Sequence, residues 1–255
     1  MLVFVFFCLG AIFASFIGVL VSRVNTGARI ASDRSRCDSC GETLTGVDLI
    51  PIVSWLVFKG RCRECGSKIP AELFIGELVL GVLFVAAYYK LGVSYELLLF
   101  CIALCLLLAI VLYDLRHQII PDVFLWPFVA LSVLLALLGP GDLLKTTFLT
   151  ALVLGGSLAL IHFLTGGKGM GLADAPLAFG LALLSGSSAL AGFIFSFWIG
   201  AVVGIIILAR RQKGHRMGVE VPFAPFLVAG FLLAFFSGWD PFALISSSLL
   251  LAFPV

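Results

Sequence analysis

The chain has 255 residues, of which 62% are hydrophobic and only 12% are charged, and its mean hydropathy is +1.20. A soluble domain carries about 25% charged residues. This composition therefore excludes an ordinary soluble domain and indicates a surface that faces lipid. The net charge of +2 gives no indication of nucleic-acid binding. We expect membrane lipid, and no nucleic acid, among the partners.

Apolar stretches recur along the chain at a length of about 20 residues, which is what crossing a bilayer requires. The expected spans lie near residues 2–22, 71–89, 95–113, 121–138, 143–164, 174–186, 188–209 and 222–237. The sixth is short for a span and is consistent with a broken or tilted helix, and the apolar piece 241–254 is too short to count. The predicted fold class is all-α: a polytopic membrane helical bundle of about eight transmembrane helices.

Lys and Arg are distributed unevenly among the loops between these spans. When alternate loops are assigned to opposite sides, all of the 16 basic residues except Lys90 and Lys145 fall on one side. Loops rich in Lys and Arg stay in the cytosol. The pattern predicts a multi-pass protein of the bacterial inner (cytoplasmic) membrane, with the N-terminus outside. Residues 2–21 carry no charge and follow no basic segment, so we expect a retained helix rather than a secretory signal.

The polar loop 23–70 contains two Cys-x-x-Cys-Gly pairs, Cys37 with Cys40 and Cys62 with Cys65. Four thiolates can complete a tetrahedral Zn²⁺ shell, and the glycine after each pair permits the tight turn around the metal. Two disulfides are the competing interpretation, but a cytosolic loop lies in a reducing compartment. We therefore predict a structural zinc. A loop this short needs such a constraint to fold.

Two acidic residues lie at the predicted membrane surface. Asp114 ends the third span, and Asp174 opens the sixth after the glycine-rich segment 166–171. Ionisable residues at spans are costly and are candidates for function. Two neighbouring carboxyl groups can share one proton, because like charges at close range do not both ionise easily. One could then activate water as a base while the other protonates a scissile carbonyl, so the pair could hydrolyse a peptide bond.

Each acidic residue also has a structural interpretation. Asp174 could cap a helix that has Pro176 in its first turn. Asp114 could pair with Arg116 or extend toward the membrane interface. Asp122, which follows a proline at the start of the fourth span, is expected to be a helix cap rather than a catalyst.

Several motifs, in chain order, resemble those of a single family. They are Ser15-Phe16, Arg23, Arg36-Cys37-x-x-Cys40-Gly41, Ile50-Pro51-Ile52-Val53-Ser54-Trp55, Gly60-Arg61-Cys62-Arg63-x-Cys65-Gly66, Glu77, the segment from Asp114 to Pro121-Asp122, Gly171-Leu172-Ala173-Asp174 and Pro222-Phe223-Ala224-Pro225-Phe226-Leu227. With these motifs the chain resembles the bacterial type IV prepilin peptidases, which are GxGD-class intramembrane aspartic proteases.

The resemblance implies that Asp114 and Asp174 occupy the two catalytic positions. Family members remove the leader peptide of type IV prepilins or pseudopilins at the cytosolic membrane face. Many also methylate the new N-terminus with S-adenosylmethionine, and a zinc-binding loop is characteristic of the bacterial members. The implied organisation is a first transmembrane helix (1–22), a cytosolic zinc-ribbon-like loop (23–70) and a transmembrane aspartic peptidase bundle (71–255).

The chain departs from the family's pattern at three positions. Ala173 replaces the Gly before the second Asp, Pro176 stands where Lys is usual, and Gly18 stands where Asn is common. The first two departures motivate a rival hypothesis, a catalytically weak homologue that acts as a scaffold in a pilus or secretion assembly. An ion-coupled transporter is a further alternative, although the spans lack the deep charged residues that an ion path needs.

Overall fold

The structure, a computed structural model, describes residues 1–24, 35–37, 39–139, 141–167, 169–210 and 221–241. Three of the basic residues that define the charge asymmetry, Arg211, Lys213 and Arg216, lie outside these residues, as does the apolar piece 241–254 except for its first residue. The chain forms two compact units, Met1–Leu112 and Tyr113–Val255, which are described separately.

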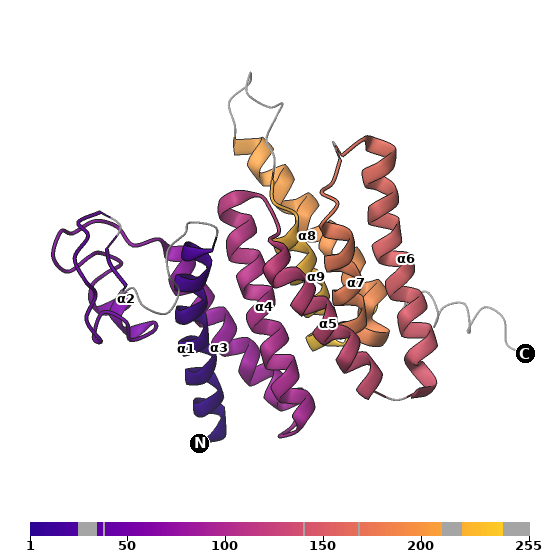
Figure 1. Ribbon diagram of the computed structural model, residues 1–255, viewed down its shortest axis with the longest axis horizontal. Helices are drawn as coiled ribbons and strands as arrows, with labels where there is room; N and C mark the ends of the chain where they lie inside the picture. The colour runs from indigo at the N-terminus through magenta and orange to yellow at the C-terminus, as the bar shows by residue number, and fades with distance from the viewer. Residues whose placement is uncertain (25–34, 38, 140, 168, 211–220, 242–255) are drawn as a thin grey trace, which may run out of the picture. The chain divides into compact units, whose positions relative to one another are not determined.

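The described part of the chain is helical, with isolated β-bridges but no strand (Figure 1). Its main helices are α1 (Leu2–Arg23), α3 (Ala71–Leu91), α4 (Tyr95–His117), α5 (Asp122–Leu138), α6 (Gly141–Thr165), α7 (Asp174–Ser185), α8 (Ala189–Arg210) and α9 (Ala224–Ser237). A five-residue helix, α2 (Val53–Val57), lies in the polar loop, and a 3₁₀ turn, η1 (Gly186–Ser188), joins α7 to α8. The all-α prediction is confirmed, and each predicted span coincides with one of these main helices.

Several of these helices can cross a membrane. Among the described residues, five segments are long and apolar enough to do so: Leu2–Arg23, Ala71–Leu91, Tyr95–His117, Leu143–Thr165 and Asp174–Ala209. The apolar helices α5 and α9 are shorter. The protein is therefore a polytopic membrane helical bundle, as its composition predicted.

In the first unit, α1 and α3 pack closely because glycines lie at their contact. A Cβ atom added to Gly10 would lie 2.7 Å from the carbonyl oxygen of Leu80, and one added to Gly81 would lie 2.9 Å from the ring of Phe7. Small residues at a membrane-helix contact let the backbones approach and gain van der Waals packing. Any larger residue at either glycine must separate the two helices.

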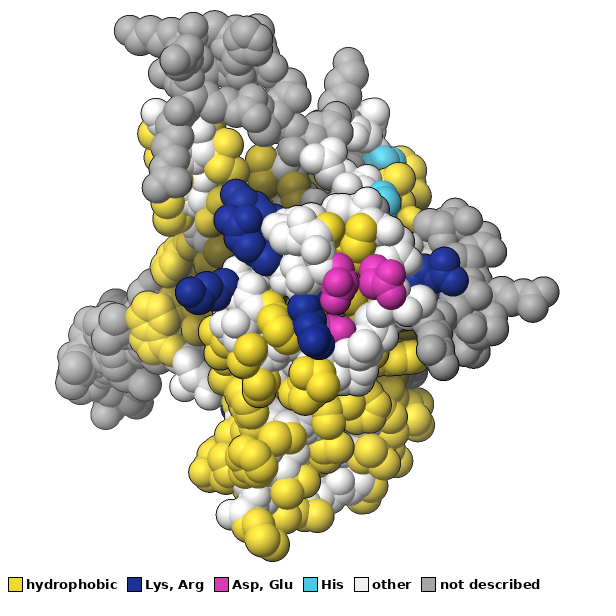
Figure 2. Space-filling view, turned by 90° about the vertical axis from the view of Figure 1, so that its left-hand side faces the viewer, with side chains coloured by type: hydrophobic (Ala, Val, Ile, Leu, Met, Phe, Trp, Pro, Cys, Tyr) yellow, Lys and Arg dark blue, Asp and Glu magenta, His cyan; other side chains and the backbone are white. Residues whose placement is uncertain are grey.

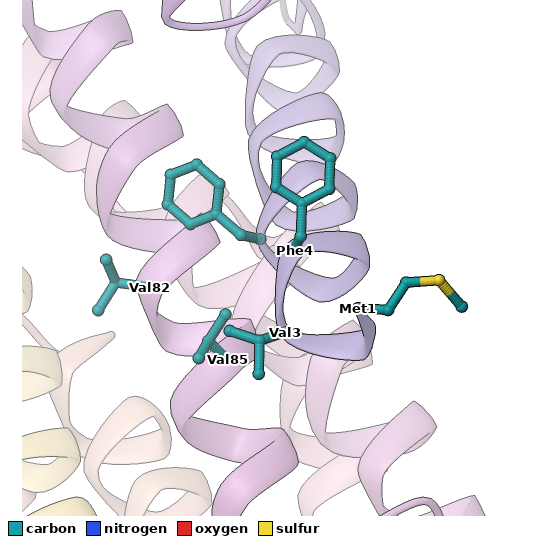
Figure 3. A pocket seen from close by; sticks show the side chains of 6 residues that line it. Met1, Val3, Phe4, Val82 and Val85 are labelled. Carbon is teal, nitrogen blue, oxygen red and sulfur yellow. The ribbon is translucent and has the colours of Figure 1, made fainter.

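An open groove of about 450 Å³ lies between the beginning of α1 and the middle of α3. Figure 3 shows Val3 and Phe4 of α1 opposite Val82 and Val85 of α3. All of its lining side chains are hydrophobic. The groove belongs to the apolar surface of the helix pair and offers no polar group to a ligand.

In the second unit, the short helix α7 forms the core. It contacts α5, α6, α8 and α9 (Figure 1), and ten of its residues are buried. Gly180 permits the contact with α5, because a Cβ there would lie 2.7 Å from the ring of Phe128. A helix enclosed by other helices need not match the bilayer thickness by itself, which explains why the sixth predicted span is so short.

Candidate active site and metal centre

Asp114 lies one turn inside α4 rather than at the end of its span, since the helix continues to His117. Its side chain is only 5% exposed. The backbone N–H of Ala224, the first residue of α9, donates a hydrogen bond of 3.2 Å to Asp114 Oδ2. The first N–H groups of a helix lack partners within the helix, and the helix dipole favours negative charge there. The start of α9 therefore stabilises a carboxylate at position 114.

Asp174 is the first residue of α7 and is 6% exposed. Its Oδ2 accepts a hydrogen bond of 3.1 Å from the backbone N–H of Gly171. The helix-cap interpretation is wrong, because the N-cap residue is Ala173 and no side chain caps the helix. Asp122 was also expected to be a cap, but the N-cap of α5 is Pro121, and Asp122 is exposed without a capping hydrogen bond.

The segment before Asp174 is anchored to the end of α6. The ring nitrogen Nδ1 of His162 lies 2.8 Å from the carbonyl oxygen of Met170, and the N–H of Gly169 donates a 3.1 Å hydrogen bond to the hydroxyl of Thr165. The chain leaves α6 through Gly167, whose φ of +78° is favourable only for glycine. These contacts determine where the Gly171 N–H points, and so fix its bond to Asp174.

Both carboxyl groups line one cavity of about 910 Å³ in the second unit. Its other lining residues are Gln118, Ile119, Ile120, Gly166, Gly167, Gly169, Met170, Gly171, Leu172, Ala173, Val221, Pro222 and Phe223. Segments 114–120, 166–174 and 221–223 thus meet at one cavity, and the alternation of loops assigned all three to one membrane face.

The departures from the family pattern near Asp174 fit the backbone without strain. Ala173 has φ −69° and ψ −17°, which an L-residue adopts freely. Close approach instead occurs at Gly171, where a Cβ would lie 3.3 Å from Asp174 Oδ2. Pro176 occupies the first turn of α7, where the missing N–H costs no helix hydrogen bond. The crowded position beside the carboxyl group is therefore 171, where a side chain would make Asp174 shift by a few tenths of an ångström.

Two features of the cavity were not predicted from the sequence. The segment Val221–Phe223 lines one wall, and the N–H of Ala224 holds Asp114. The prolines at 222 and 225 mark the beginning of α9, so a free N–H at this point could have been anticipated. Its carboxylate partner, 110 residues earlier in the chain, could not.

The four cysteines of the polar loop meet in the first unit. The sulfur atoms of Cys37, Cys40, Cys62 and Cys65 all lie within 4.8 Å of one another, and none of the four is in a disulfide. Four sulfurs at about 2.3 Å from a tetrahedral zinc are about 3.8 Å apart. The separation of 3.9 Å between the sulfurs of Cys37 and Cys65 fits this geometry. These residues can hold a metal ion, as the spacing predicted.

The two cysteine pairs have the same local structure. The N–H of Gly41 donates to the carbonyl of Cys37, and the N–H of Gly66 donates to that of Cys62, at 2.9 and 3.0 Å. Both glycines have positive φ, +73° and +69°. The predicted role of glycine after each pair is confirmed, because only glycine adopts this turn without strain.

The surroundings of the thiols favour binding of a cation. The backbone N–H of Cys40 and the hydroxyl of Ser67 lower the pKa of the Cys37 thiol to about 6, and Ser67 also lowers the pKa of Cys65. At Cys40, the backbone N–H of Glu42 acts to lower the pKa, but desolvation and the neighbouring sulfurs raise it to about 12. Crowded thiolates repel one another, and a bound Zn²⁺ removes that repulsion.

Glu77, which the family resemblance singled out without a role, links the polar loop to α3. Its side chain is 8% exposed, and Oε2 accepts a hydrogen bond of 2.6 Å from the backbone N–H of Ile52. Ile52 has φ +63°, an uncommon conformation for a β-branched residue.

The third departure from the family pattern is Gly18. A Cβ on Gly18 would lie 2.6 Å from Leu73, whose side chain fills the space that an Asn would need.

Comparison with known proteins gives one consistent result. Residues 8–91 match the Bacterial Peptidase A24 N-terminal domain, and residues 101–209 match the Type IV leader peptidase family. The chain is 34% identical over 238 residues to a prepilin leader peptidase/N-methyltransferase of Bacillus subtilis (strain 168), covering 92% of this chain and 94% of that relative. Proteins with the same name from Myxococcus xanthus (33% identity, 82% of this chain, 64% of the relative) and Dichelobacter nodosus (34%, 78% and 69%) are also similar. No solved structure matches the chain.

Proposed function

The chain belongs to the type IV leader peptidase family, and from this premise we propose that it is an aspartic endopeptidase of the inner membrane. Its substrates are type IV prepilins or pseudopilins, from which it removes the leader peptide. Asp114 and Asp174 are the catalytic pair.

The observation that supports this function best is the shared cavity of the two buried carboxyl groups. Each group uses Oδ2 to accept one backbone N–H, from Ala224 at Asp114 and from Gly171 at Asp174. Among the residues that the structure describes, no protein group hydrogen-bonds Oδ1 of either side chain. These oxygens are thus available to water and substrate, while the backbone holds the carboxyl groups in place.

The chemistry follows from this arrangement. One carboxylate accepts a proton from a water molecule as the water oxygen forms a bond to the scissile carbonyl carbon. The other, protonated, carboxyl group donates a hydrogen bond or proton to the carbonyl oxygen. Collapse of the tetrahedral intermediate breaks the C–N bond, and the leaving amine takes up a proton. The pair exchanges protonation roles during the reaction, so both residues are needed.

The metal centre has a structural role in this proposal. All four ligands of the Zn²⁺ come from the protein, so no open coordination position remains for substrate. The zinc loop and the cavity lie on the cytosolic side and the N-terminus lies outside, because nearly all Lys and Arg residues fall in loops on one side. Reporter tags at residues 30 and 91 test this: position 30 should report cytosol and position 91 the outside, and the reverse pattern would overturn the orientation.

We extend the proposal to methylation of the new N-terminus with S-adenosylmethionine as the methyl donor. Its support is that the relatives' names pair the two activities. The test is mass spectrometry of the mature product after incubation with and without S-adenosylmethionine. A methyl adduct only when the donor is present supports the extension, and an unmodified product in both samples contradicts it without affecting the peptidase.

The rival hypotheses are less favoured. A scaffold without activity was motivated by Ala173 and Pro176, but both residues fit the backbone around Asp174 without strain. A transporter is not favoured by the family membership. The decisive experiment incubates the purified full-length protein, in detergent, with the prepilins encoded in its own genome. Leader removal supports the peptidase, and failure on every such substrate by folded, zinc-loaded protein would favour the scaffold.

A further inference from the structure

The polar loop carries an exposed apolar surface that neither the metal centre nor the peptidase accounts for. Its members, which we call the loop patch, are at least 41% exposed: Val47, Leu49, Ile50, Val53, Leu56 and Val57. Three of them lie on α2 and the others shortly before it. Val53, Leu56 and Val57 are spaced so that they share one face of α2. A group of apolar side chains exposed together marks an interaction site.

Contacts within the first unit place the loop patch along a membrane helix. The ring of Trp55 in α2 stacks on Phe74 of α3 with centroids 4.5 Å apart, and the N–H of Ile52 bonds to Glu77. Phe74 and Glu77 lie in the first two turns of α3, about 4.5 and 9 Å along the axis from its beginning. α2 therefore packs beside the first turns of a span and does not project beyond its end.

The depth of these contacts argues for lipid around the loop patch. α3 has 21 residues and is about 31 Å long, close to the thickness of the bilayer's hydrocarbon core. Groups level with Phe74 and Glu77 then lie about 4–9 Å inside one end of that core, next to its boundary with the head groups. Apolar side chains exposed at this level gain free energy from lipid, and a Trp in the same position is typical of membrane interfaces.

Basic residues adjoin the loop patch in the sequence. Lys59, Arg61, Arg63 and Lys68 follow α2 and are all exposed. Figure 2, seen from the left-hand side of Figure 1, shows Lys and Arg side chains together with Asp and Glu side chains near its centre, and a broad hydrophobic surface below them. Apolar residues combined with nearby cations match the chemistry of an anionic bilayer surface, which attracts cationic side chains.

We propose that the loop patch is a membrane-contact surface. It inserts into the head-group region of an anionic bilayer and holds the zinc loop against the membrane. The polar loop thus lies on the bilayer instead of projecting into solution. This inference does not depend on the peptidase activity or on which side of the membrane the loop occupies.

The test uses the full-length, zinc-loaded protein in nanodiscs that contain phosphatidylglycerol, with the photo-crosslinking residue p-benzoylphenylalanine in place of Leu56. Irradiation should yield a protein–lipid adduct by mass spectrometry. The matched control carries the same residue in place of Glu42, which is exposed in the same loop, and should lose the adduct. The proposal would be overturned if the variant at position 56 formed no lipid adduct. It would also be overturned if that variant cross-linked instead to a second copy of the chain or to added prepilin. Zinc content checks that both variants are folded.

A second measurement requires no probe in the patch. Trp126→Phe, Trp198→Phe and Trp239→Phe together leave Trp55 as the sole tryptophan, and the three replaced side chains are exposed. Lipids brominated near the head-group end of the acyl chain should quench the fluorescence of Trp55 more strongly than lipids brominated near the chain end. Equal, weak quenching by both would place Trp55 in water and contradict the proposal.

Discussion

The two units keep polar groups in an apolar protein by different means. In the first unit, four cysteines collect at one point of a loop that has little core of its own, and a metal ion can replace that core. In the second unit, the buried carboxyl groups are held by N–H groups of the backbone at the start of α9 and before α7. In our proposal a metal thus stabilises a structure that the loop cannot maintain alone, whereas helix packing positions the two carboxyl groups.

This difference has a direct consequence for perturbation of the protein. Loss of the metal should unfold the loop but leave the helices of the second unit intact. Loss of a carboxyl group should remove the chemistry but leave both folds intact.

The largest expected effect concerns the metal. Cys62→Ser removes the ligand that is buried, and structural zinc contributes about 10–16 kcal/mol of apparent folding free energy in small metal-dependent domains. We expect loss of stoichiometric zinc by elemental analysis and rapid proteolysis within residues 35–70, with the second unit resistant. Cys8→Ser, a free cysteine of α1 away from the cluster, should keep its zinc. A Cys62→Ser protein with a protected loop would contradict the account.

The next effect concerns the carboxyl pair. Asp114→Asn and Asp174→Asn keep the size of the side chain but cannot exchange the proton that water attack needs, so each should lower the cleavage rate at least about a thousandfold. Asp122→Asn is the matched control, because Asp122 is exposed and does not line the cavity. It should retain most of the activity. Near-normal cleavage by a folded Asp174→Asn protein would remove Asp174 from the mechanism.

A smaller effect is expected at the contact of α1 with α3. Gly81→Leu forces a side chain against Phe7 and should reduce stability by about 1–3 kcal/mol, the usual cost of overpacking. Gly156→Leu on α6 is the control, because no atom lies within 4 Å of its Cβ position. Thermal unfolding in detergent compares the two variants. Equal stability of both would mean that the close packing of α1 and α3 contributes little.

The smallest effect is expected at Ala173, one of the three departures from the family pattern. Ala173→Gly should change the cleavage rate by less than about twofold, because Ala173 already has a conformation open to any L-residue. The measurement is the cleavage rate under conditions matched to the wild-type protein. A tenfold rise would indicate that the methyl group of Ala173 obstructs the substrate.

The sequence predicted the helices well because lipid imposes a strong and local signal, a run of apolar residues about as long as the bilayer is thick. The cysteine cluster was predicted for a similar reason, since its spacing and glycines are local. The predicted end of the third span, near residue 113, was about one turn too early. Leu115 and Arg116 continue α4 to His117 although the apolar run has ended.

The features that the sequence did not predict depend mainly on contacts between residues far apart in the chain. Nothing near Asp114 indicates that the N–H of Ala224 will bind it, and nothing near Glu77 indicates Ile52 as its partner. The helix α2 is five residues long, too short to produce a periodic pattern. The sequence singled out the two aspartates because charged groups at spans are costly and because of the family resemblance, but their common cavity arises only when residue 114 meets the beginnings of α7 and α9.

The most direct test of the central claim, that the two carboxyl groups act as one unit in a single cavity, compares four proteins: wild type, Asp114→Asn, Asp174→Asn and the double variant. The measurement is the rate of leader removal from a matched prepilin, with folding and membrane insertion checked for each protein. Because each residue needs the other, the double variant should be about as slow as either single variant. A double variant slowed by the product of the two single effects would show that the residues act independently, and would contradict the account.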